Sequence, residues 1–283
     1  MFEKSLVHLF PFNGEFFAVD VNSGSLLNLD EATYFYLEKL QETESKELAF
    51  NLTKEKFGDV AEEIQEEVDN LISEGFLFSK APNYFESNLI LKSMCLNVAH
   101  SCNFGCLYCF AKKGNYGGKD ALMSLDVARA SIDFLVKNSG ERNALEIDFF
   151  GGEPLLNFDV VKKTIEYART TYKDKNFRFT LTTNGSLLTD EIEKFLYDND
   201  VSIVLSLDGD KTTNDKYRVL RNGAGTFDLV FPRVKKVAEH RKDSGGYYVR
   251  GTYTHDTLHI SKTVMDLHDF GFKYISLEPV VTK

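Results

Sequence analysis

The chain has 283 residues, of which 43% are hydrophobic, and this suffices to bury the core of one or two domains. Its net charge of −10 argues against a nucleic-acid partner, because nucleic-acid-binding surfaces are basic. No run approaches the roughly 18 apolar residues of a membrane span, and the N-terminus has no apolar signal region. These observations predict a cytoplasmic protein that does not span a membrane.

The acidic charge is concentrated near the N-terminus. Residues 1–80 hold 17 acidic and 6 basic side chains, whereas the rest of the chain holds 26 and 27. We therefore expect a small acidic module at 1–80 and a nearly neutral domain at 93–283. Residues 81–92 begin with Ala-Pro-Asn and are typical of a linker between the two.

The N-terminal module is predicted to mix strands and helices. Its expected elements, in chain order, are strands over 16–21 and 25–29, helices over 31–40, 45–57 and 60–74, and a closing strand over 76–78. Asn22-Ser23-Gly24 marks the turn between the first two strands, and Asp30 can cap the first helix. This pattern is typical of a winged-helix-like module, and a purely structural extension is the alternative.

From residue 93 onwards, short apolar strands alternate with helices. The strands are expected over 94–99, 145–150, 177–183, 201–207, 247–253 and 273–280. The helices are expected over 124–137, 158–172, 189–198, 226–240 and 261–269. Such alternation predicts an α/β fold of parallel strands with right-handed crossovers, either a doubly wound sheet or a barrel.

Glycine-rich or polar residues follow four of these strands. They are Gly151-Gly152-Glu153, residues 182–185, Asp208-Gly209 and Glu278-Pro279. The carboxyl ends of parallel strands meet at one edge of a barrel, and functional sites lie there. We therefore expect a site at this edge, with glycines that let a ligand approach the backbone closely. An ordinary turn into the next helix is the alternative for any single one of them.

The four cysteines, Cys95, Cys102, Cys106 and Cys109, all lie within 15 residues. A disulfide framework is normally spread through a fold, so this grouping favours metal binding. The last three have the spacing C-x3-C-x2-C, and three thiolates on an iron–sulfur cubane leave one iron open to a ligand. Structural zinc, with Cys95 or His100 as a fourth ligand, and a redox disulfide between Cys106 and Cys109 are the alternatives. Cys95 is otherwise predicted to be a core residue of the first strand.

A C-x3-C-x2-C motif followed by Phe, directly after the first strand of such an array, resembles radical S-adenosylmethionine (SAM) enzymes. Gly151-Gly152-Glu153-Pro154 after the second strand matches their glycine-rich motif. The resemblance covers residues 93–283 and implies a partial (β/α)6 barrel with a [4Fe–4S] cluster on Cys102, Cys106 and Cys109. It also implies that SAM binds the fourth iron and is cleaved to a 5′-deoxyadenosyl radical that abstracts hydrogen from the substrate. The electron donor would be a protein such as ferredoxin or flavodoxin.

The resemblance assigns further side chains to SAM and no catalytic residue beyond the cluster. The implied SAM contacts are Tyr108, Phe110, Gly151, Gly152, Glu153, Pro154, Asn184, Ser206 and Arg218. Tyr108 and Phe110 resemble the residues beside the adenine, and the glycine-rich segment resembles the contact for the amino group. Ser206 and Arg218 resemble the pair near the methionine carboxylate, where Arg221 is a competing choice, because an arginine fork suits a carboxylate.

A closer resemblance rests on longer phrases, namely VDVNSGSL, LNVAHSCNFGCLYCFAKKGNYGG, EIDFFGGEPLLNFDVVKK, FRFTLTTNG and YYVRGTYT. They resemble the six-cysteine (SCIFF) peptide maturases, which install thioether bridges in ribosomally made peptides. In that family a winged-helix-type module binds the leader of the precursor peptide as an added strand, which implies the same role for residues 1–80. Carbon–carbon crosslinking, sulfatase-type oxidation and a non-catalytic metal-binding protein are the alternatives.

The family normally continues into a cysteine-rich domain with auxiliary iron–sulfur clusters. No cysteine follows Cys109 in this sequence. We therefore expect either a fragment of a longer protein or a protein without auxiliary clusters.

Overall fold

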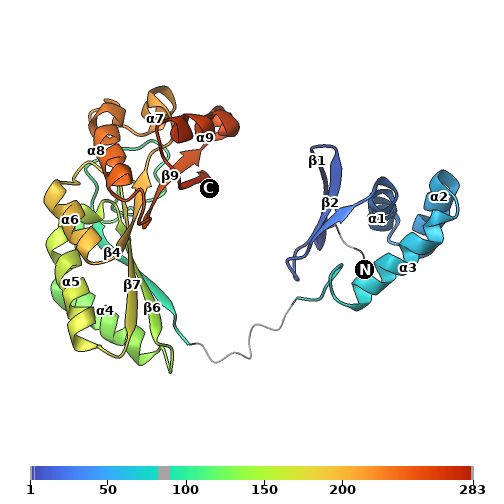
Figure 1. Cartoon of the computed structure of the whole chain (residues 1–283), viewed down its shortest axis with the longest axis horizontal. Helices are drawn as coiled ribbons and strands as arrows, with labels where there is room; N and C mark the ends of the chain where they lie inside the picture. The colour runs from blue at the N-terminus through green and yellow to red at the C-terminus, as the bar shows by residue number, and fades with distance from the viewer. Residues whose placement is uncertain (1, 3, 82–89, 282–283) are drawn as a thin grey trace. The chain divides into compact units, whose positions relative to one another are not determined.

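The computed structural model describes residues 2, 4–81 and 90–281, which fold into two compact units, Met1–Asn88 and Leu89–Lys283 (Figure 1). Each unit has its own hydrophobic core. The predicted linker at 81–92 lies largely outside the described residues. None of the helices in the described part of the chain is long and apolar enough to cross a membrane.

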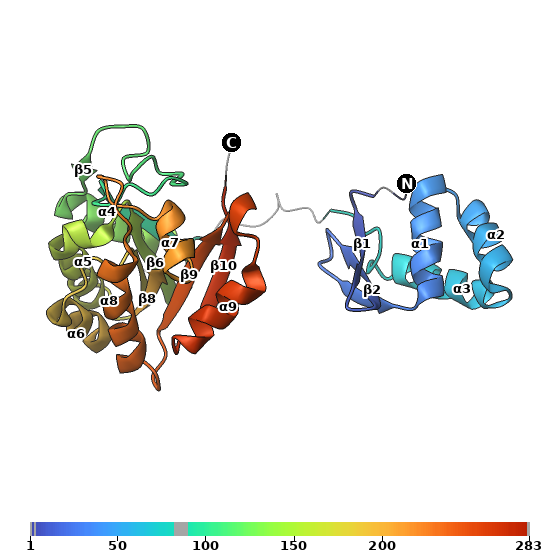
Figure 2. The ribbon, with the colours of Figure 1, turned by 90° about the horizontal axis from the view of Figure 1, so that it is seen from above.

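The N-terminal unit packs three helices on one side of a small antiparallel sheet (Figure 2). Its strands, in spatial order, are β1 (Val7–Phe12), β2 (Glu15–Asp20) and β3 (Leu26–Leu29). Its helices are α1 (Glu31–Thr43), α2 (Lys46–Phe57) and α3 (Val60–Ser73). Apolar residues at helical spacing, such as Leu37 and Leu40 of α1 and Ile64 and Val68 of α3, form its core. Asp30 caps α1 as predicted, accepting the Thr33 N–H at 2.7 Å.

The structure differs from the prediction for this unit in two places. Strand β1 has no predicted counterpart, although Asn13-Gly14, with φ angles of 52° and 84°, is a strong signal for a two-residue hairpin turn. Pro11 argues against a strand in the sequence, because proline lacks an N–H and is tolerated only in an edge strand. In the structure β1 is such an edge strand. The closing strand expected over 76–78 is a series of bends instead, and the positive φ of 47° at Phe78 lies outside the strand region.

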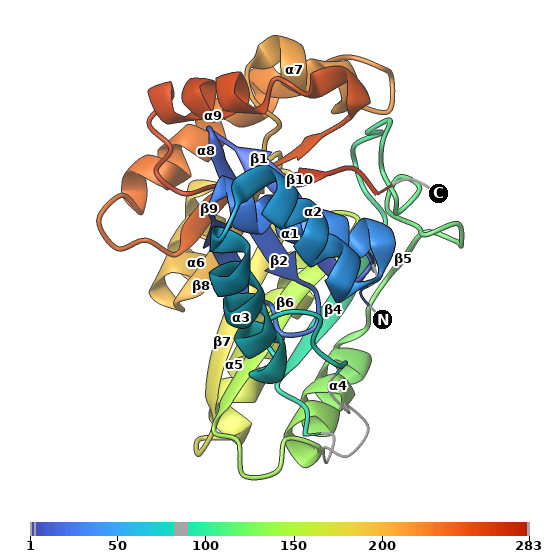
Figure 3. The ribbon, with the colours of Figure 1, turned by 90° about the vertical axis from the view of Figure 1, so that its right-hand side faces the viewer.

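The C-terminal unit is built on a seven-stranded sheet in the order β10-β9-β8-β7-β6-β4-β5 (Figure 3). Its strands are β4 (Ser93–His100), β5 (Ala121–Leu122), β6 (Ala144–Gly151), β7 (Asn176–Thr183), β8 (Val201–Ser206), β9 (Tyr247–Tyr253) and β10 (Ile275–Pro279). Every neighbouring pair is parallel except β4 with β5, so the predicted parallel sheet is confirmed. The short strand β5 has no predicted counterpart.

Helices connect the parallel strands, and α4, α5, α6 and α8 lie along one face of the sheet (Figure 1). They are α4 (Leu125–Lys137), α5 (Phe158–Thr171), α6 (Asp190–Asp198), α7 (Lys211–Tyr217), α8 (Phe227–His240) and α9 (Ile260–Asp269), with short 3-10 helices η2 (Pro154–Asn157) and η3 (His255–Thr257). Ser124 caps α4 as predicted. Helix α7 has no predicted counterpart, because its seven residues, KTTNDKY, carry no apolar stripe.

The two faces of the large sheet differ in character. Apolar side chains such as Ile147 of β6 and Phe179 of β7 are buried under the helices. The opposite face, here called the inner face, carries polar side chains, and Cys95, Asp148 and Thr180 form one row across β4, β6 and β7. Because parallel sheets are normally buried on both faces, a polar inner face indicates that this side has a function beyond packing.

Asp20, at the end of β2, connects this strand by hydrogen bonds to the turn at Ser23 and to Ser79 beyond α3. It is fully buried and accepts hydrogen bonds from the backbone N–H and hydroxyl of Ser79 and from those of Ser23. Burial opposes its charge, but the bonds from Ser79 and Ser23 outweigh that effect and lower the pKa of Asp20 below 3.8. Its stabilising contribution is therefore present at neutral pH and is lost as the pH falls through its lowered pKa.

We expect Asp20→Ala to destabilise the N-terminal unit by about 1–3 kcal/mol, because the Ser79 and Ser23 N–H groups lose their buried acceptor. Hydrogen exchange of the full chain would show faster exchange throughout β2 and α3. Asp69→Ala is the matched control, since Asp69 forms a half-exposed ion pair with Lys46 and its loss should cost little. Equal effects of the two variants would contradict the role given to Asp20.

Candidate functional site

The loop that carries the cysteines lies at the carboxyl end of the parallel strands. Figure 3 shows α7 and the loop between β4 and β5 at the same end of the sheet. The Gly105 N–H donates to the Val219 carbonyl at 2.8 Å, and the Leu107 N–H donates to the Tyr217 carbonyl at 2.9 Å. The segment that ends α7 therefore holds the cysteine loop, so an element that no sequence pattern predicted helps to position the site.

Arg218 and Arg221 both lie in this segment but do different things. Arg221 donates from Nε and Nη2 to the Cys102 carbonyl, at 3.0 and 2.6 Å, and so braces the loop backbone. Arg218 is only 7% exposed and lines the cavity beside the cysteines. Of the two competing candidates for a carboxylate contact, Arg218 has the side chain that faces this cavity.

A cavity of about 270 Å³ lies between the cysteine loop and the strand ends. The predicted site residues that line it are Cys102, Cys106, Tyr108, Cys109, Phe110, Gly151, Gly152, Asn184, Ser206 and Arg218. Glu153 and Pro154, also predicted, are buried but do not line it. Arg250 and Thr252 line the cavity without having been predicted, and Glu278, from a strand end that was expected to contribute to the site, lines it too. Side chains alternate between the two faces of a strand, so the sequence Tyr-Val-Arg-Gly-Thr-Tyr could have predicted that Arg250 and Thr252 share one face.

The two glycines after β6 are explained by the chain's own backbone. A Cβ on Gly151 would lie 2.3 Å from the Ala99 carbonyl oxygen, and one on Gly152 would lie 2.2 Å from that of Ser101. The Gly152 N–H donates to Ala99 at 2.8 Å. The missing side chains thus leave room for Ala99 and Ser101. Gly151 and Gly152 also line the cavity, so our expectation that a ligand approaches their backbone stays a prediction.

Glu153 joins the ends of β6 and β7. Its carboxylate accepts hydrogen bonds from the Thr183 hydroxyl at 2.8 Å, the Asn184 N–H at 2.8 Å and the Leu155 N–H at 3.0 Å. Burial raises the pKa of Glu153 to about 6, although these bonds oppose the rise. Both carboxylate oxygens are thus used within the protein, and the side chain does not point into the cavity.

A buried polar group links the cysteine loop to β8. The Tyr108 hydroxyl donates to Asp208 at 2.7 Å and accepts from Arg218 Nη1 at 3.0 Å, and Asp208 also accepts the Thr252 N–H at 3.0 Å. Burial raises the pKa of Asp208, while Arg218 opposes the rise. Arg218 Nε is buried and has no hydrogen-bond partner among the described residues. Because Arg218 lines the cavity and carries a positive charge, the cavity fits an anionic ligand.

Cys95 is not the core residue that the sequence predicted. It is exposed on the inner face, because its neighbours Leu96 and Val98 take the helix-covered side of β4. It does not line the cavity that contains the other three cysteines. The physical reason is the alternation of side chains along a strand, which places position 95 opposite to 96 and 98.

The other three cysteines all line one cavity, as the ligands of a single cluster would. No group of three or more His, Cys, Asp or Glu side chains in the described residues is close enough to hold a single metal ion. The thiolates of a cubane bind different irons and so lie further apart than ligands of one ion. Burial raises the pKa of Cys102 to about 11 and also raises that of Cys106, which Arg218 opposes. Iron binding must therefore remove their protons.

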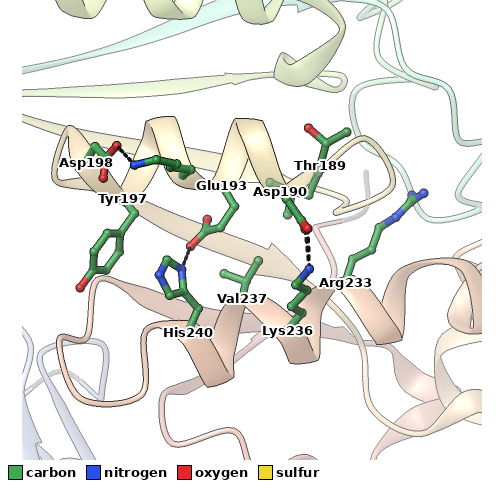
Figure 4. A pocket seen from close by; sticks show the side chains of 11 residues that line it. Thr189, Asp190, Glu193, Tyr197, Asp198, Arg233, Lys236, Val237 and His240 are labelled. Atoms are coloured by element: carbon green, nitrogen blue, oxygen red, sulfur yellow. Dashed lines mark hydrogen bonds and ion pairs between the residues drawn. The ribbon is translucent and has the colours of Figure 1, made fainter.

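A second cavity, of about 400 Å³, lies between α6 and α8 (Figure 4). Its charged side chains pair with one another: Lys236 with Asp190 at 2.6 Å, and His240 with Glu193 at 3.0 Å. None of the predicted site residues lines it. Its polar groups are therefore explained by helix packing, and the candidate site is the cavity beside the cysteines.

We expect Gly152→Ala to destabilise the C-terminal unit by on the order of 1–3 kcal/mol, because the new methyl group overlaps the Ser101 carbonyl. Denaturant unfolding and the alkylation rate of Cys102 measure this, and the rate should rise as the loop is displaced. Gly118→Ala in the same loop is the control, since its Cβ would meet only the Asn115 carbonyl at 3.4 Å. Normal stability of Gly152→Ala would refute the packing explanation.

The sequence of the chain matches that of known radical enzymes. The profile of the Radical SAM superfamily matches residues 96–262. The radical SAM cyclopropyl synthase TigE of Paramaledivibacter caminithermalis is 24% identical over 238 residues, which are 75% of this chain and 48% of that protein. A cysteine-type anaerobic sulfatase-maturating enzyme of Clostridium novyi is 27% identical over 195 residues, 66% of this chain and 50% of that protein. The chain thus spans about half the length of the curated relatives it matches.

Solved structures share the fold. The structure of anSMEcpe with bound AdoMet superimposes with a TM-score of 0.60 at 24% identity, over 68% of this chain and 51% of that one. Streptococcus suis SuiB bound to S-adenosylmethionine superimposes with a TM-score of 0.51 at 16% identity, over 98% of this chain and 63% of that one. The parallel sheet is therefore a partial barrel of the radical SAM type. Because the superfamily profile covers more than half of the chain, the protein belongs to the radical SAM superfamily, whose cofactors are a [4Fe–4S] cluster and SAM.

Proposed function

We propose that this chain modifies a ribosomally made peptide by radical SAM chemistry and that the modification is a thioether crosslink. The observation that carries the proposal is that Cys102, Cys106, Cys109 and Arg218 line one cavity. The sulfatase-maturating relatives support peptide or protein as the substrate, since they are named for maturing another protein. The phrases shared with the six-cysteine maturases favour the thioether over other modifications.

Cys102, Cys106 and Cys109 would hold the cluster, and the loop backbone that bears them is braced by Arg221. The bound cofactors supply a 5′-deoxyadenosyl radical, which takes a hydrogen atom from the substrate. Burial raises the pKa of the Cys106 thiol, and the nearby Arg218 opposes that rise, which favours the thiolate that iron requires. The protein otherwise contributes position and shielding.

Arg218 and Ser206 would bind the methionine carboxylate of SAM. Burial weakens the charge of Arg218, but Tyr108, Cys106 and Asp208 outweigh this and keep the guanidinium protonated. Tyr108 is fixed by its hydroxyl, which leaves its ring to line the cavity beside Phe110. This geometry supports an adenine contact for both rings.

The glycine-rich segment would meet SAM through its backbone. Gly151 and Gly152 line the cavity. Both oxygens of the Glu153 carboxylate, in contrast, already accept hydrogen bonds from Leu155, Thr183 and Asn184. We therefore assign the amino-group contact of this segment to main-chain atoms. Asn184 lines the same cavity and donates to the Asn103 side chain at 3.0 Å, so it would both brace the loop and face SAM.

The N-terminal unit would serve as a winged-helix-like module that docks the leader of the precursor peptide. Its sheet has two edges, β1 and β3, and Pro11 removes one N–H donor from β1. We therefore assign the docking edge to β3, where an extended peptide could add a strand. A remote docking site suits a radical enzyme with a flexible substrate, because tethering raises the local concentration of the reacting segment.

We expect the anaerobically reconstituted chain to be brown and to convert SAM to 5′-deoxyadenosine under reduction. Cys102→Ala, Cys106→Ala and Cys109→Ala should each lose the cluster, since only two thiolates would remain. Cys95→Ala is the matched control and should retain it, because Cys95 lies outside the cavity. Iron content and the visible spectrum report the cluster. A colourless, inactive wild-type protein after sound reconstitution would refute the proposal.

The type of modification is decided by mass spectrometry of a peptide encoded beside the gene, co-expressed with the enzyme. Thioether formation removes two hydrogens and consumes a free thiol, whereas carbon–carbon crosslinking leaves every thiol free. Peptide modified without loss of a thiol would exclude the thioether.

We expect the unmodified peptide to bind the full chain at least about tenfold more tightly than a variant lacking residues 1–80. Fluorescence anisotropy with a labelled leader measures this. Because the unit is acidic, a basic leader should bind more weakly as salt rises. Equal binding to both proteins would place the docking site elsewhere.

A further inference from the structure

Asp148 is a partly buried acidic side chain whose hydrogen-bonding capacity is largely unused. Its Oδ1 is buried and has no partner among the described residues. Its Oδ2 meets only the thiol of Cys95, at a long 3.9 Å, and that thiol lies equally far from the Asn97 amide oxygen. One S–H proton cannot serve both acceptors, so the carboxylate is poorly satisfied by the protein itself.

Glu153 and Asp208, which are among the buried carboxylates of the C-terminal unit, provide the contrast. Glu153 accepts three hydrogen bonds, and Asp208 accepts from the Tyr108 hydroxyl and the Thr252 N–H. A carboxylate that serves the fold is thus well supplied with donors in this protein. Asp148 lacks them, and an ionised group without partners destabilises the folded state.

The surroundings of Asp148 connect it with the candidate site. It lies in the row of Cys95 and Thr180 on the inner face, opposite the face along which α4, α5, α6 and α8 lie. Arg250 on β9 interacts electrostatically with Asp148 and also lines the cavity beside the three cysteines. Arg250 is itself paired with Glu278, so it does not supply the missing hydrogen bond. A ligand that leaves the cavity along the inner face would therefore reach Asp148.

We propose that Asp148 is a substrate-positioning residue, whose carboxylate accepts a hydrogen bond from an N–H group of the peptide substrate. This proposal rests on the proposed function, because it takes a peptide as the occupant of the inner face. Cys95 completes the subsite as a neutral thiol, since burial and the nearby Asp148 raise its pKa to about 11. The donor is either a backbone amide or a basic side chain of the peptide, and the experiment separates the two.

The charge state of Asp148 follows from the groups that face it. Burial raises its pKa to about 6, and the Cys95 thiol and Arg250 oppose the rise. Tyr248, also on the inner face, is neutral at physiological pH, because burial raises its pKa further. Asp148 therefore binds its proton more tightly in the folded than in the unfolded chain. Its contribution to stability is favourable at acidic pH and is lost as the pH rises through about 6.

The first test needs no peptide. Thermal unfolding of the full chain is compared for wild type, Asp148→Asn and the control Glu146→Gln, which lies on the same strand and face but pairs with Lys92 at 3.1 Å. We expect Asp148→Asn to melt at a higher temperature than wild type at pH 7.5, with a smaller gain at pH 5. Glu146→Gln should change little at either pH. A lower melting temperature of Asp148→Asn at pH 7.5 would overturn the proposal, since it would reveal a structural role.

The second test uses the reconstituted full chain and the co-expressed peptide that it modifies. We expect Asp148→Asn to raise the KM for the peptide about tenfold, with a smaller effect on kcat, and to release more 5′-deoxyadenosine per modified peptide. Asp148→Glu should restore part of the affinity, and Glu146→Gln should behave as wild type. Wild-type binding should strengthen as the pH rises through about 6, and Asp148→Asn should lose this step. Unchanged KM and coupling in Asp148→Asn would overturn the proposal.

Peptides with each basic residue replaced by glutamine separate the two kinds of donor. Loss of the Asp148 effect with one such peptide assigns a side chain, and its persistence with all of them assigns a backbone amide. Failure of the proposed function is distinguishable, because the wild type would then modify no peptide. In that case the melting comparison alone decides whether Asp148 serves the fold or a ligand.

Discussion

The start of the cysteine loop packs against the backbone of Gly151 and Gly152, and the candidate site depends on that contact. The Gly152 N–H reaches the Ala99 carbonyl at 2.8 Å, and the Glu153 N–H reaches that of Ser101 at 3.0 Å. Neither glycine position has room for a Cβ. Since Cys102 is the next residue along the loop, its location relative to β6 follows directly from these main-chain bonds.

The glycine-rich segment also fixes the end of a third strand, β7, through Glu153. Glu153 accepts bonds from Thr183 and Asn184, so the ends of β4, β6 and β7 are held together by one motif. Asn184 in turn contacts the cysteine loop through Asn103. The glycine-rich motif is thus a clamp between strand ends as well as part of a cavity wall, which gives it a structural reason independent of any ligand.

Hydrogen-bond satisfaction separates the polar groups that serve the fold from those that face a ligand. Glu153 and Asp208 are buried and well supplied with donors. Arg218 Nε and Asp148 Oδ1 are buried but unpaired among the described residues. Buried polar groups in native proteins nearly always have partners, and this motivates the ligand contacts proposed for Arg218 and Asp148. The Tyr36 hydroxyl in the core of the N-terminal unit is a further unpaired atom among the described residues.

The sequence by itself determined the order of the elements in the large sheet, the helix caps at Asp30 and Ser124, and the motifs that identify the superfamily. These features are local: alternation, capping and loop spacing each depend on a few adjacent residues. The short helix α7 and strand β1 were not predicted from the sequence, because α7 lacks an apolar stripe and β1 contains Pro11.

Only the tertiary structure decided which arginine faces the cavity, why the glycines are needed, and that Cys95 and Asp148 share the inner face. Each of these depends on residues that are distant in sequence: Tyr108 and Asp208 are 100 positions apart, and Cys95 and Asp148 are 53 apart. Such contacts arise from strand register and from loops crossing the sheet edge, and no local pattern records which partners they bring together.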